Sequence, residues 1–277
     1  MKYKIIADSC CDFTHELKER FDVTHVPLTL RLGSKEFTDD ENIDLPGFMS
    51  EMKVCKEKVG SAAPAPYLFQ DAMEKAEQSF VITLSSELSG TYNSAIAGKK
   101  FAQENKDIFT HVIDSKSAAA GEALIAIRLR EFIQSGMARD AIIQAISRFV
   151  DNMKTYFVLE NYDNLKKNGR MSKVTGTLAT ILDLKLLMGA DGNGGITLVA
   201  KQRGISRAID KIVSLIKESG KKPEEETLVV SHCNNQALAE RLTDAIRRLY
   251  NFKEIFVIPT KGVSSLYADD KGVVLAF

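Results

Sequence analysis

Short apolar runs alternate with helical stretches through the first half of this sequence, and this alternation restricts the fold more than any other feature. Runs of strand length stand at Lys4–Ala7, Phe80–Leu84 and His111–Ile113, and a helical pattern follows each of them. Strands that alternate with amphipathic helices are typical of a parallel sheet with helices on its faces. We therefore predict an α/β fold with a parallel sheet in its N-terminal half.

Other segments of the first half have patterns of their own. Val23–Leu30 alternates between apolar and polar residues, which predicts a strand. Ser34–Leu45 is polar and rich in turn formers, and Val59–Pro66 holds two prolines among small residues, so both are predicted as loops. A helix is predicted over Tyr67–Gln78.

The pattern changes near residue 155. Thr155–Leu159 has strand character, Tyr162–Gly169 is a short helix with a glycine stop, and Asp191–Gly195 is a hairpin turn. Further strands are predicted at Lys185–Met188, Ile196–Ala200, Thr227–Ser231, Ile255–Ile258 and Gly272–Phe277, and helices at Ser206–Glu218 and Gln236–Leu249. We predict two domains, residues 1–154 and a smaller α/β domain of residues 155–277, which agrees with about 150 residues per domain.

Charge and composition argue against several classes of protein. Lys plus Arg and Asp plus Glu both number 37, whereas nucleic-acid-binding proteins usually carry a basic excess. The cysteines form no CxxC pair and the histidines no HExxH pattern, so no metal site is expected. No apolar stretch reaches the length of a signal peptide or a membrane-spanning helix. We expect a soluble, cytoplasmic protein without a cofactor, which contacts a membrane surface at most transiently.

Polar residues follow the three apolar runs, beginning at Asp8, Ser85 and Asp114. The carboxyl ends of parallel strands form the ligand crevice of such sheets. The first N–H groups of the helices that follow also need partners. Asp8 and Asp114 are interpreted mainly as helix N-caps, because capping is the commoner role and a carboxylate would repel an anionic ligand.

The segment Ser85–Ser94 has more hydroxyl groups than capping requires. One cap needs one hydroxyl, whereas the serines and threonine of this segment supply five. Gly90 would let the backbone approach a ligand closely. Neutral hydroxyls beside helix N–H groups suit a carboxylate or phosphate oxygen, so the segment predicts an anion cradle. It lacks the Gly-x-Ser-x-Gly pattern of a nucleophile elbow.

Three single residues are further candidates. Ser61 stands in a rigid proline-containing turn and is either a helix cap or a ligand contact. Arg170 directly follows a helix stop, and a C-cap or surface position and an anion contact are equally compatible with it. His232 lies just past a predicted strand, where packing is favoured over ligand contact.

Together these segments resemble the DegV family of fatty-acid-binding proteins. The resemblance spans nearly the whole chain in order, and its most specific parts are Leu-Ser-Gly-Thr-Tyr and Gly-Arg-Met-Ser. The segments that carry it are Asp8–Asp12, Ser61–Pro66 with Phe69, Leu84–Ala95, Ile113–Lys116 with Gly121, Leu165–Ser172 and Leu182–Leu187.

The resemblance implies two α/β domains with a long-chain fatty acid in the cleft between them. It implies a lipid-binding protein that is not itself an enzyme and that presents the acid to an ATP-dependent fatty acid kinase subunit. The two hydroxyls that hold the carboxylate in the family correspond to Ser61 and Ser89. The arginine of the Gly-Arg motif corresponds to Arg170.

The sequence departs from the family pattern near its C-terminal end. Tyr267 stands where the family has a histidine, and Ala268–Lys271 stands where the family has a glycine-rich run. A tyrosine can donate a hydrogen bond to the ligand, so Tyr267 is included in the predicted site, but it cannot switch charge as histidine can. We therefore expect lipid binding to be kept and kinase presentation to be weak or lost.

Three hypotheses about function follow. The chain is a lipid carrier without catalysis, an enzyme that acts on a phosphorylated small molecule through its cleft hydroxyls and His232, or a regulatory subunit that senses a lipid and binds a protein partner. The fold alone does not separate them. A long-chain acid retained by the purified protein would favour the first or the third.

Overall fold

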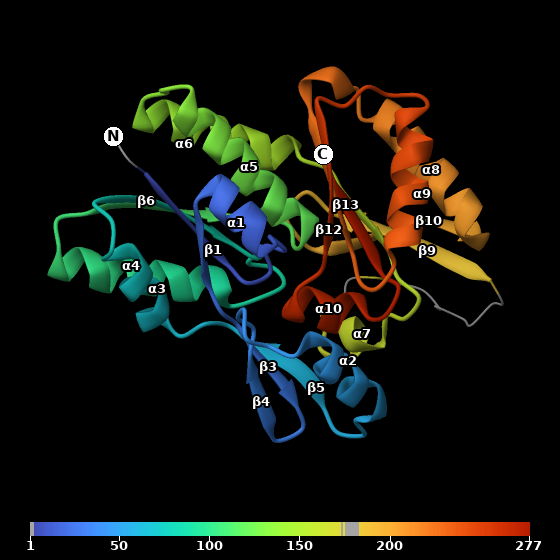
Figure 1. The fold of residues 1–277 in the computed structure, drawn as a ribbon, viewed down its shortest axis with the longest axis horizontal. Helices are drawn as coiled ribbons and strands as arrows, with labels where there is room; N and C mark the ends of the chain where they lie inside the picture. Colours follow the sequence, from blue (N-terminus) through green and yellow to red (C-terminus); the bar gives the residue numbers. More distant parts are fainter. Residues whose placement is uncertain (1–2, 173, 175–182) are drawn as a thin grey trace.

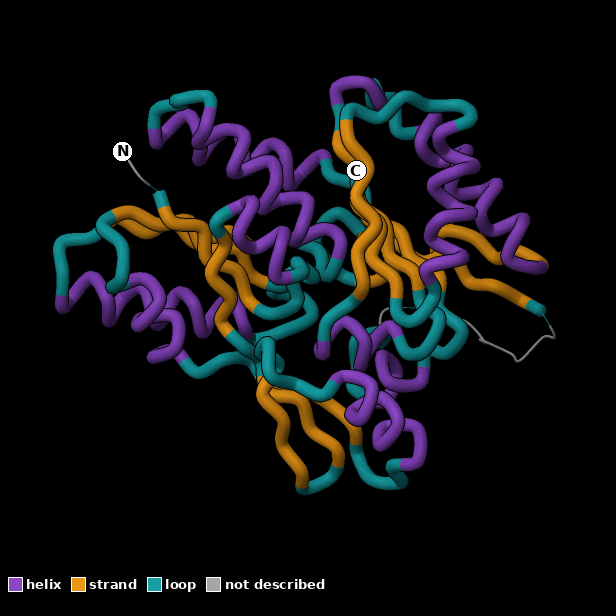
Figure 2. The backbone as a smooth tube through the Cα atoms, in the orientation of Figure 1, coloured by secondary structure: helices purple, strands orange, loops and turns teal. Residues whose placement is uncertain are grey.

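The computed structural model describes residues 3–172, 174 and 183–277. Two main sheets lie side by side, one built from the first half of the chain and the other from the second (Figure 1). A third, small sheet lies apart from both of them (Figure 2). The predicted α/β fold is confirmed.

The N-terminal sheet is wholly parallel, as predicted, with the strand order β2-β1-β6-β7. Helices α3 and α4 cover one face, whereas α1 and α5 cover the other and α6 packs on α5 (Figure 1). The strands are β1 (Lys4–Asp8), β2 (Val23–Val26), β6 (Gln78–Thr83) and β7 (Phe109–Asp114). The helices are α1 (His15–Phe21), α3 (Pro66–Met73), α4 (Thr91–Asn105), α5 (Ala120–Gln134) and α6 (Arg139–Asn152).

The small antiparallel sheet corrects three predictions. Its order is β4-β3-β5, with β3 at Thr29–Leu32, β4 at Lys35–Thr38 and β5 at Val59–Ala62. Helix α2 (Leu45–Val54) lies between β4 and β5 in the chain. The single strand predicted over residues 23–30 is wrong, because the chain leaves the parallel sheet at Pro27, which has no N–H to continue a ladder. The loops predicted over residues 34–45 and 59–66 contain β4 and β5.

The C-terminal sheet is mixed and has the order β10-β9-β8-β13-β11-β12, in which only β11 and β12 pair in parallel. Its strands are β8 (Thr155–Val158), β9 (Leu184–Ala190), β10 (Ile196–Arg203), β11 (Thr227–His232), β12 (Glu254–Pro259) and β13 (Val273–Ala276). Its helices are α7 (Asp163–Lys167), α8 (Gly204–Glu218), α9 (Gln236–Arg247), α10 (Gly262–Ala268) and a 3-10 turn at Pro223–Glu225.

The predicted hairpin turn joins β9 and β10, where the Asp191 carboxylate accepts the N–H groups of Asn193 and Gly195, both at 2.9 Å. Leu182, which begins one of the family-like segments, lies outside the described residues.

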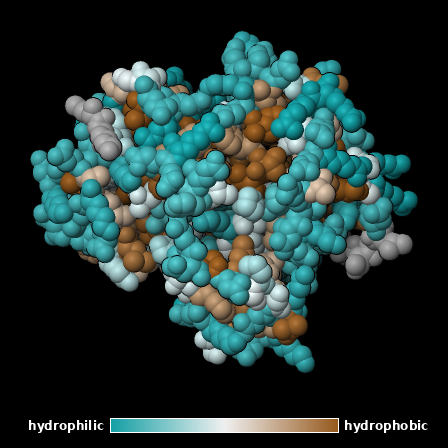
Figure 3. All heavy atoms as spheres, viewed as in Figure 1, coloured by the Kyte–Doolittle hydropathy of each residue, from teal (hydrophilic) through white to brown (hydrophobic). Residues whose placement is uncertain are grey.

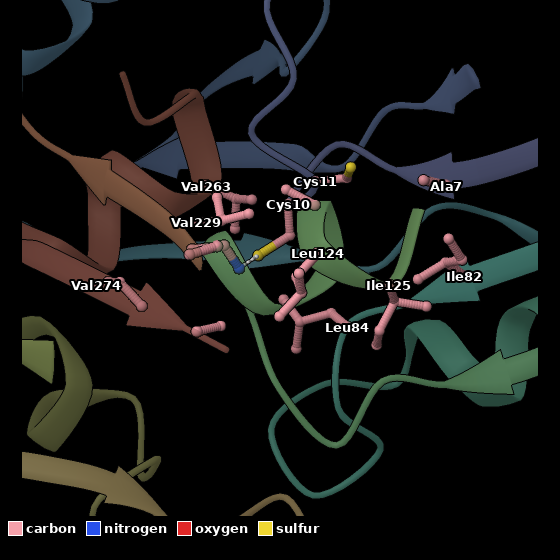
Figure 4. Packing of buried hydrophobic residues seen from close by; sticks show 14 of the residues in the cluster. Ala7, Cys10, Cys11, Ile82, Leu84, Leu124, Ile125, Val229, Val263 and Val274 are labelled. Atoms are coloured by element: carbon pink, nitrogen blue, oxygen red, sulfur yellow. Dashed lines mark hydrogen bonds between the residues drawn. The ribbon is translucent and has the colours of Figure 1, made fainter. Parts of the chain in front are cut away.

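One hydrophobic core joins the two halves. Figure 4 shows Cys10, Leu84 and Leu124 from the first half packed near Val263 and Val274 from the second. Helix α5 contacts strands of both main sheets. The six-stranded sheet begins at residue 155, and the division of the chain into domains at that point stays a prediction.

Buried carboxylates also connect the halves. Asp12 Oδ1 accepts the N–H of Lys261 at 2.9 Å, and the two oxygens of Asp39 accept the N–H groups of Gly262 and Val263, each at 2.9 Å. Ser9 Oγ donates to Asp39 at 2.8 Å. Residues of the first half therefore hold the first turn of α10, whose leading N–H groups have no partner inside that helix.

Asp8 and Glu122 lie near these carboxylates, and both are buried. Asp8, Glu122 and the Cys10 thiol have their ligand atoms within 4.8 Å of one another. Burial raises the pKa of Asp8 to about 6 and that of Asp12 to about 7, and it raises the pKa of Glu122 well above its usual range. The cluster therefore holds protons at a pH where exposed carboxyl groups have lost them.

Asp12→Asn should flatten the dependence of stability on pH. The folded protein keeps the Asp12 proton up to about pH 7, whereas the pKa of the unfolded carboxyl is near 3.8, so stability falls as pH rises through this window. An asparagine can still accept the Lys261 N–H and has no charge to bury. The free energy of unfolding should then decline less steeply, by up to about 1.4 kcal/mol per pH unit.

Urea denaturation across this pH window measures the effect. Asp107→Asn, at an exposed position, is the matched control. Parallel pH profiles for wild type and Asp12→Asn would contradict the prediction.

Candidate ligand-binding cavity

A cavity of about 110 Å³ lies between the two halves. Its wall is mainly apolar, and its larger side chains include Leu28, Leu84, Leu88, Phe157, Leu159 and Val263. Figure 3 shows hydrophobic side chains gathered between the halves within a largely hydrophilic surface.

The four residues predicted to bind the ligand all line this one cavity. Ser61 comes from β5, Ser89 from the segment before α4, Arg170 from the turn after α7, and Tyr267 from α10. These elements are far apart in the sequence and meet only in the folded chain. The structure thus brings the four side chains together around an otherwise apolar space.

Ser61 and Tyr267 form a hydrogen-bonded pair. Their hydroxyl oxygens are 3.1 Å apart, and either can be the donor. Ser61 pairs with Leu30 across the small sheet, so β3 and β5 fix its position. The interpretation of Ser61 as a helix cap is wrong, because α3 begins after Ala65 without any side-chain cap.

Ser89 lies at the start of α4. Its hydroxyl is 2.8 Å from that of Thr91 and accepts the Thr91 N–H at 3.3 Å. Within Ser85–Ser94, Ser89 is the hydroxyl residue that lines the cavity. The positive end of a helix dipole beside it favours an anionic ligand group.

Arg170 follows the end of α7 and lines the cavity, while its contact with an anion stays a prediction. It follows Gly169, whose φ of +76° ends the short helix α7, and its backbone N–H donates to Leu165. Its Nε donates to the Leu88 carbonyl at 3.0 Å and its Nη1 to the Asn168 carbonyl at 2.7 Å. The guanidinium lies 5.5 Å from the centre of the Tyr267 ring, which places a positive charge beside the hydroxyl pair.

The interpretation of Asp8 and Asp114 as helix caps is wrong. Asp8 accepts the N–H groups of Cys10 at 2.9 Å and Leu84 at 2.7 Å, and so joins the ends of β1 and β6. Asp114 accepts the N–H groups of Ser86 at 3.1 Å and Lys116 at 3.0 Å. Several residues separate each strand end from the next helix, so these carboxylates satisfy loop amides instead.

Most of the predicted hydroxyl cradle contacts protein rather than the cavity. Ser85 Oγ donates to the Gly194 carbonyl at 2.9 Å, Ser86 Oγ donates to Asp114, and Ser94 Oγ donates to the Pro64 carbonyl. These bonds hold the segment against neighbouring loops. Fewer hydroxyls of this segment line the cavity than the sequence predicts.

His232 is buried at the end of β11, and its Nδ1 accepts the Asn235 N–H at 3.3 Å. It is not among the residues that line the cavity, which agrees with packing. Cavity residues that sequence reasoning missed include Cys10, Ser117, Thr155 and Ser264. Among the described residues no helix has both the length and the apolar character needed to cross a bilayer.

Comparison with known proteins agrees with this geometry. A DegV domain-containing protein of Streptococcus pneumoniae is 32% identical over 284 residues, which cover 100% of this chain and 99% of the relative. A DegV family protein of Ruminococcus gnavus, solved with vaccenic acid, has a TM-score of 0.95 and 31% identity over 99% of both chains. The fatty acid kinase (Fak) B3 protein of Streptococcus pneumoniae, loaded with linoleic acid, has a TM-score of 0.90 and 30% identity over 100% of this chain and 99% of that one.

The family profile itself spans almost the entire sequence. The DegV profile matches residues 2–276, including every segment that contributes to the cavity. The agreement therefore extends from overall fold to the elements that carry the candidate site. This chain belongs to the DegV family.

Proposed function

We propose that this protein binds a long-chain fatty acid between its two halves. The observation that carries the proposal is the grouping of Ser61, Ser89, Arg170 and Tyr267 around a cavity whose wall is otherwise mainly apolar. The carboxylate lies among these four side chains and the acyl chain fills the apolar space. The vaccenic and linoleic acids bound by the two structural relatives support the same ligand class.

The energetics are compatible with so few polar contacts. About sixteen methylenes at ~0.8 kcal/mol each gain on the order of 13 kcal/mol on burial. The costs of association and ordering remove much of that gain. The carboxylate oxygens then need only hydrogen-bond donors. The hydroxyl groups provide neutral donors and the guanidinium provides a charge-assisted one.

We infer a carrier or presenting role without catalysis. Among the described residues that line the cavity, the polar side chains are hydroxyls, the Cys10 thiol, Lys116 and Arg170, and none is a histidine or carboxylate that could act as a general base. The alternative enzyme, acting on a phosphorylated small molecule, relied on His232, which lies outside the cavity lining. Lipid binding is therefore the better supported hypothesis.

Replacing Ser61 and Ser89 by Ala together should weaken fatty acid binding while the fold is kept. A lost hydrogen bond to a charged group costs roughly 1.5–3 kcal/mol, or about 10- to 150-fold in affinity per bond. Displacement of a fluorescent fatty acid measures the loss. The control replaces Ser50 and Ser147, exposed helix serines whose hydroxyls bond to carbonyls four residues earlier. Equal affinity of the two double variants would remove Ser61 and Ser89 from the site.

The second part of the proposal concerns the kinase. Asp269 and Asp270 follow α10, close in sequence to Tyr267, and replace the glycines of the family pattern. Asp269 has φ +55° and ψ 178°, a conformation that suits glycine. Asp270 is paired with Lys53 at 3.1 Å and with Asn234, and these contacts lower its pKa. The pairing reduces, but does not remove, the negative charge facing an incoming phosphate donor.

We expect the wild-type protein to be a poor partner for a fatty acid kinase. The assay combines the kinase subunit of the same organism, ATP, labelled oleate and this protein, and measures acyl phosphate. Tyr267→His with Asp269→Gly and Asp270→Gly should raise the yield, because it restores a titratable donor and removes two negative charges. Tyr267→Phe with the same two glycines is the matched control. Robust acyl phosphate formation with the wild type would reject this expectation.

A further inference from the structure

Two hydroxyl groups stand in the cavity wall outside the proposed carboxylate site. Ser117 precedes α5 in the first half of the chain, and Thr155 begins β8 in the second half. Their oxygens are 2.8 Å apart, and both residues are buried and line the cavity. Gly121 makes room for this pair, because a Cβ there would overlap Ser117 Oγ.

The pair lies toward the end of the cavity away from Tyr267. Leu159, just beyond β8, lines the cavity together with Ala268, the neighbour of Tyr267. Thr155 is four residues before Leu159 at the start of β8, which is roughly 13 Å at the usual rise per residue of a strand. Tyr156 pairs with Gly189, so the β9–β10 turn lies at the Thr155 end as well.

The two hydroxyls have more O–H donors than their mutual hydrogen bond uses. Each hydroxyl has one proton to donate, and their mutual bond uses only one of the two. Neither side-chain oxygen makes another hydrogen bond within the part of the chain that the structure describes. One O–H donor is left over beside an acyl cavity, and an unsatisfied buried donor is costly.

We propose that Ser117 and Thr155 bind an oxygen atom in the distal half of the acyl chain, so that the ligand is a hydroxy or oxo fatty acid. This inference rests on the proposed function. The leftover O–H donates to the ligand oxygen, and a ligand hydroxyl can donate in turn to a remaining lone pair of the serine or threonine. An unsubstituted chain satisfies neither group.

Binding competition among three acids tests the inference. The acids are stearic acid, a stearic acid with a hydroxyl in the distal half of the chain, and one with a hydroxyl beside the carboxyl group. The wild type should bind the distal-hydroxy acid about three- to tenfold more tightly than the plain acid. In the double variant Ser117→Ala/Thr155→Val, which removes both hydroxyls, this preference should be lost. The ratio for the proximal hydroxyl should stay unchanged.

The controls separate a binding role from a purely structural one. Thr155→Ser keeps the hydroxyl and should keep the ratio, whereas a role limited to linking the two halves would change the affinity for all three acids alike. The double variant is needed because the two hydroxyls contact each other, and either one alone keeps an O–H for the ligand. Equal ratios in wild type and the double variant would overturn the inference while leaving fatty acid binding intact. Failure of the wild type to bind any of the acids would overturn the proposed function itself.

Discussion

The two hydrogen bonds from α10 to the Asp39 carboxylate determine where the rest of the cavity can form. They fix the first turn of α10, and Gly262 permits the approach because a Cβ there would overlap Asp39 and Leu30. Tyr267 follows on the same short helix. Leu30, which Gly262 approaches, pairs with Ser61 across the small sheet, and Ser61 in turn bonds to Tyr267.

The groups around the cavity bear on how the proposed ligand would lie in it. Arg170 supplies a positive charge near Ser61 and Tyr267. Cys10, another residue of the wall, lies against the carboxyl groups of Asp8 and Glu122. At pH 7 a ligand carboxylate beside Cys10 would be repelled by Asp8, whose pKa is raised to about 6, while Glu122 keeps its proton. The charges of Arg170 and Asp8 therefore favour the same direction for the proposed ligand.

The sequence predicted the parallel sheet and most helices of the second half. The four residues that the family resemblance predicted to bind the ligand all line one cavity. The strand predicted over residues 23–30 was too long, because the apolar–polar alternation continues past Pro27, where the chain passes from one sheet to another. The strand that carries Ser61 is four residues long and contains Gly60 and Ser61, which have weak strand propensity. The roles of Asp8 and Asp114 were also missed, since a carboxylate after a strand gives no sign of which distant amide it will accept. Ser117 and Thr155 meet only through tertiary packing, which leaves no local pattern to find.

The contacts that complete the cavity join residues at nearly opposite ends of the chain. Asp39 and Gly262 are separated by 223 positions, and Cys10 and Ser264 by 254. Long-range contacts of this kind form late, because the entropy of closing the intervening chain must be overcome first. During synthesis from the N-terminus, the parallel sheet can assemble while α10 has not yet been made. We therefore expect the binding site to mature only after the last strands emerge, so that an incomplete chain has a folded sheet but no place for a ligand.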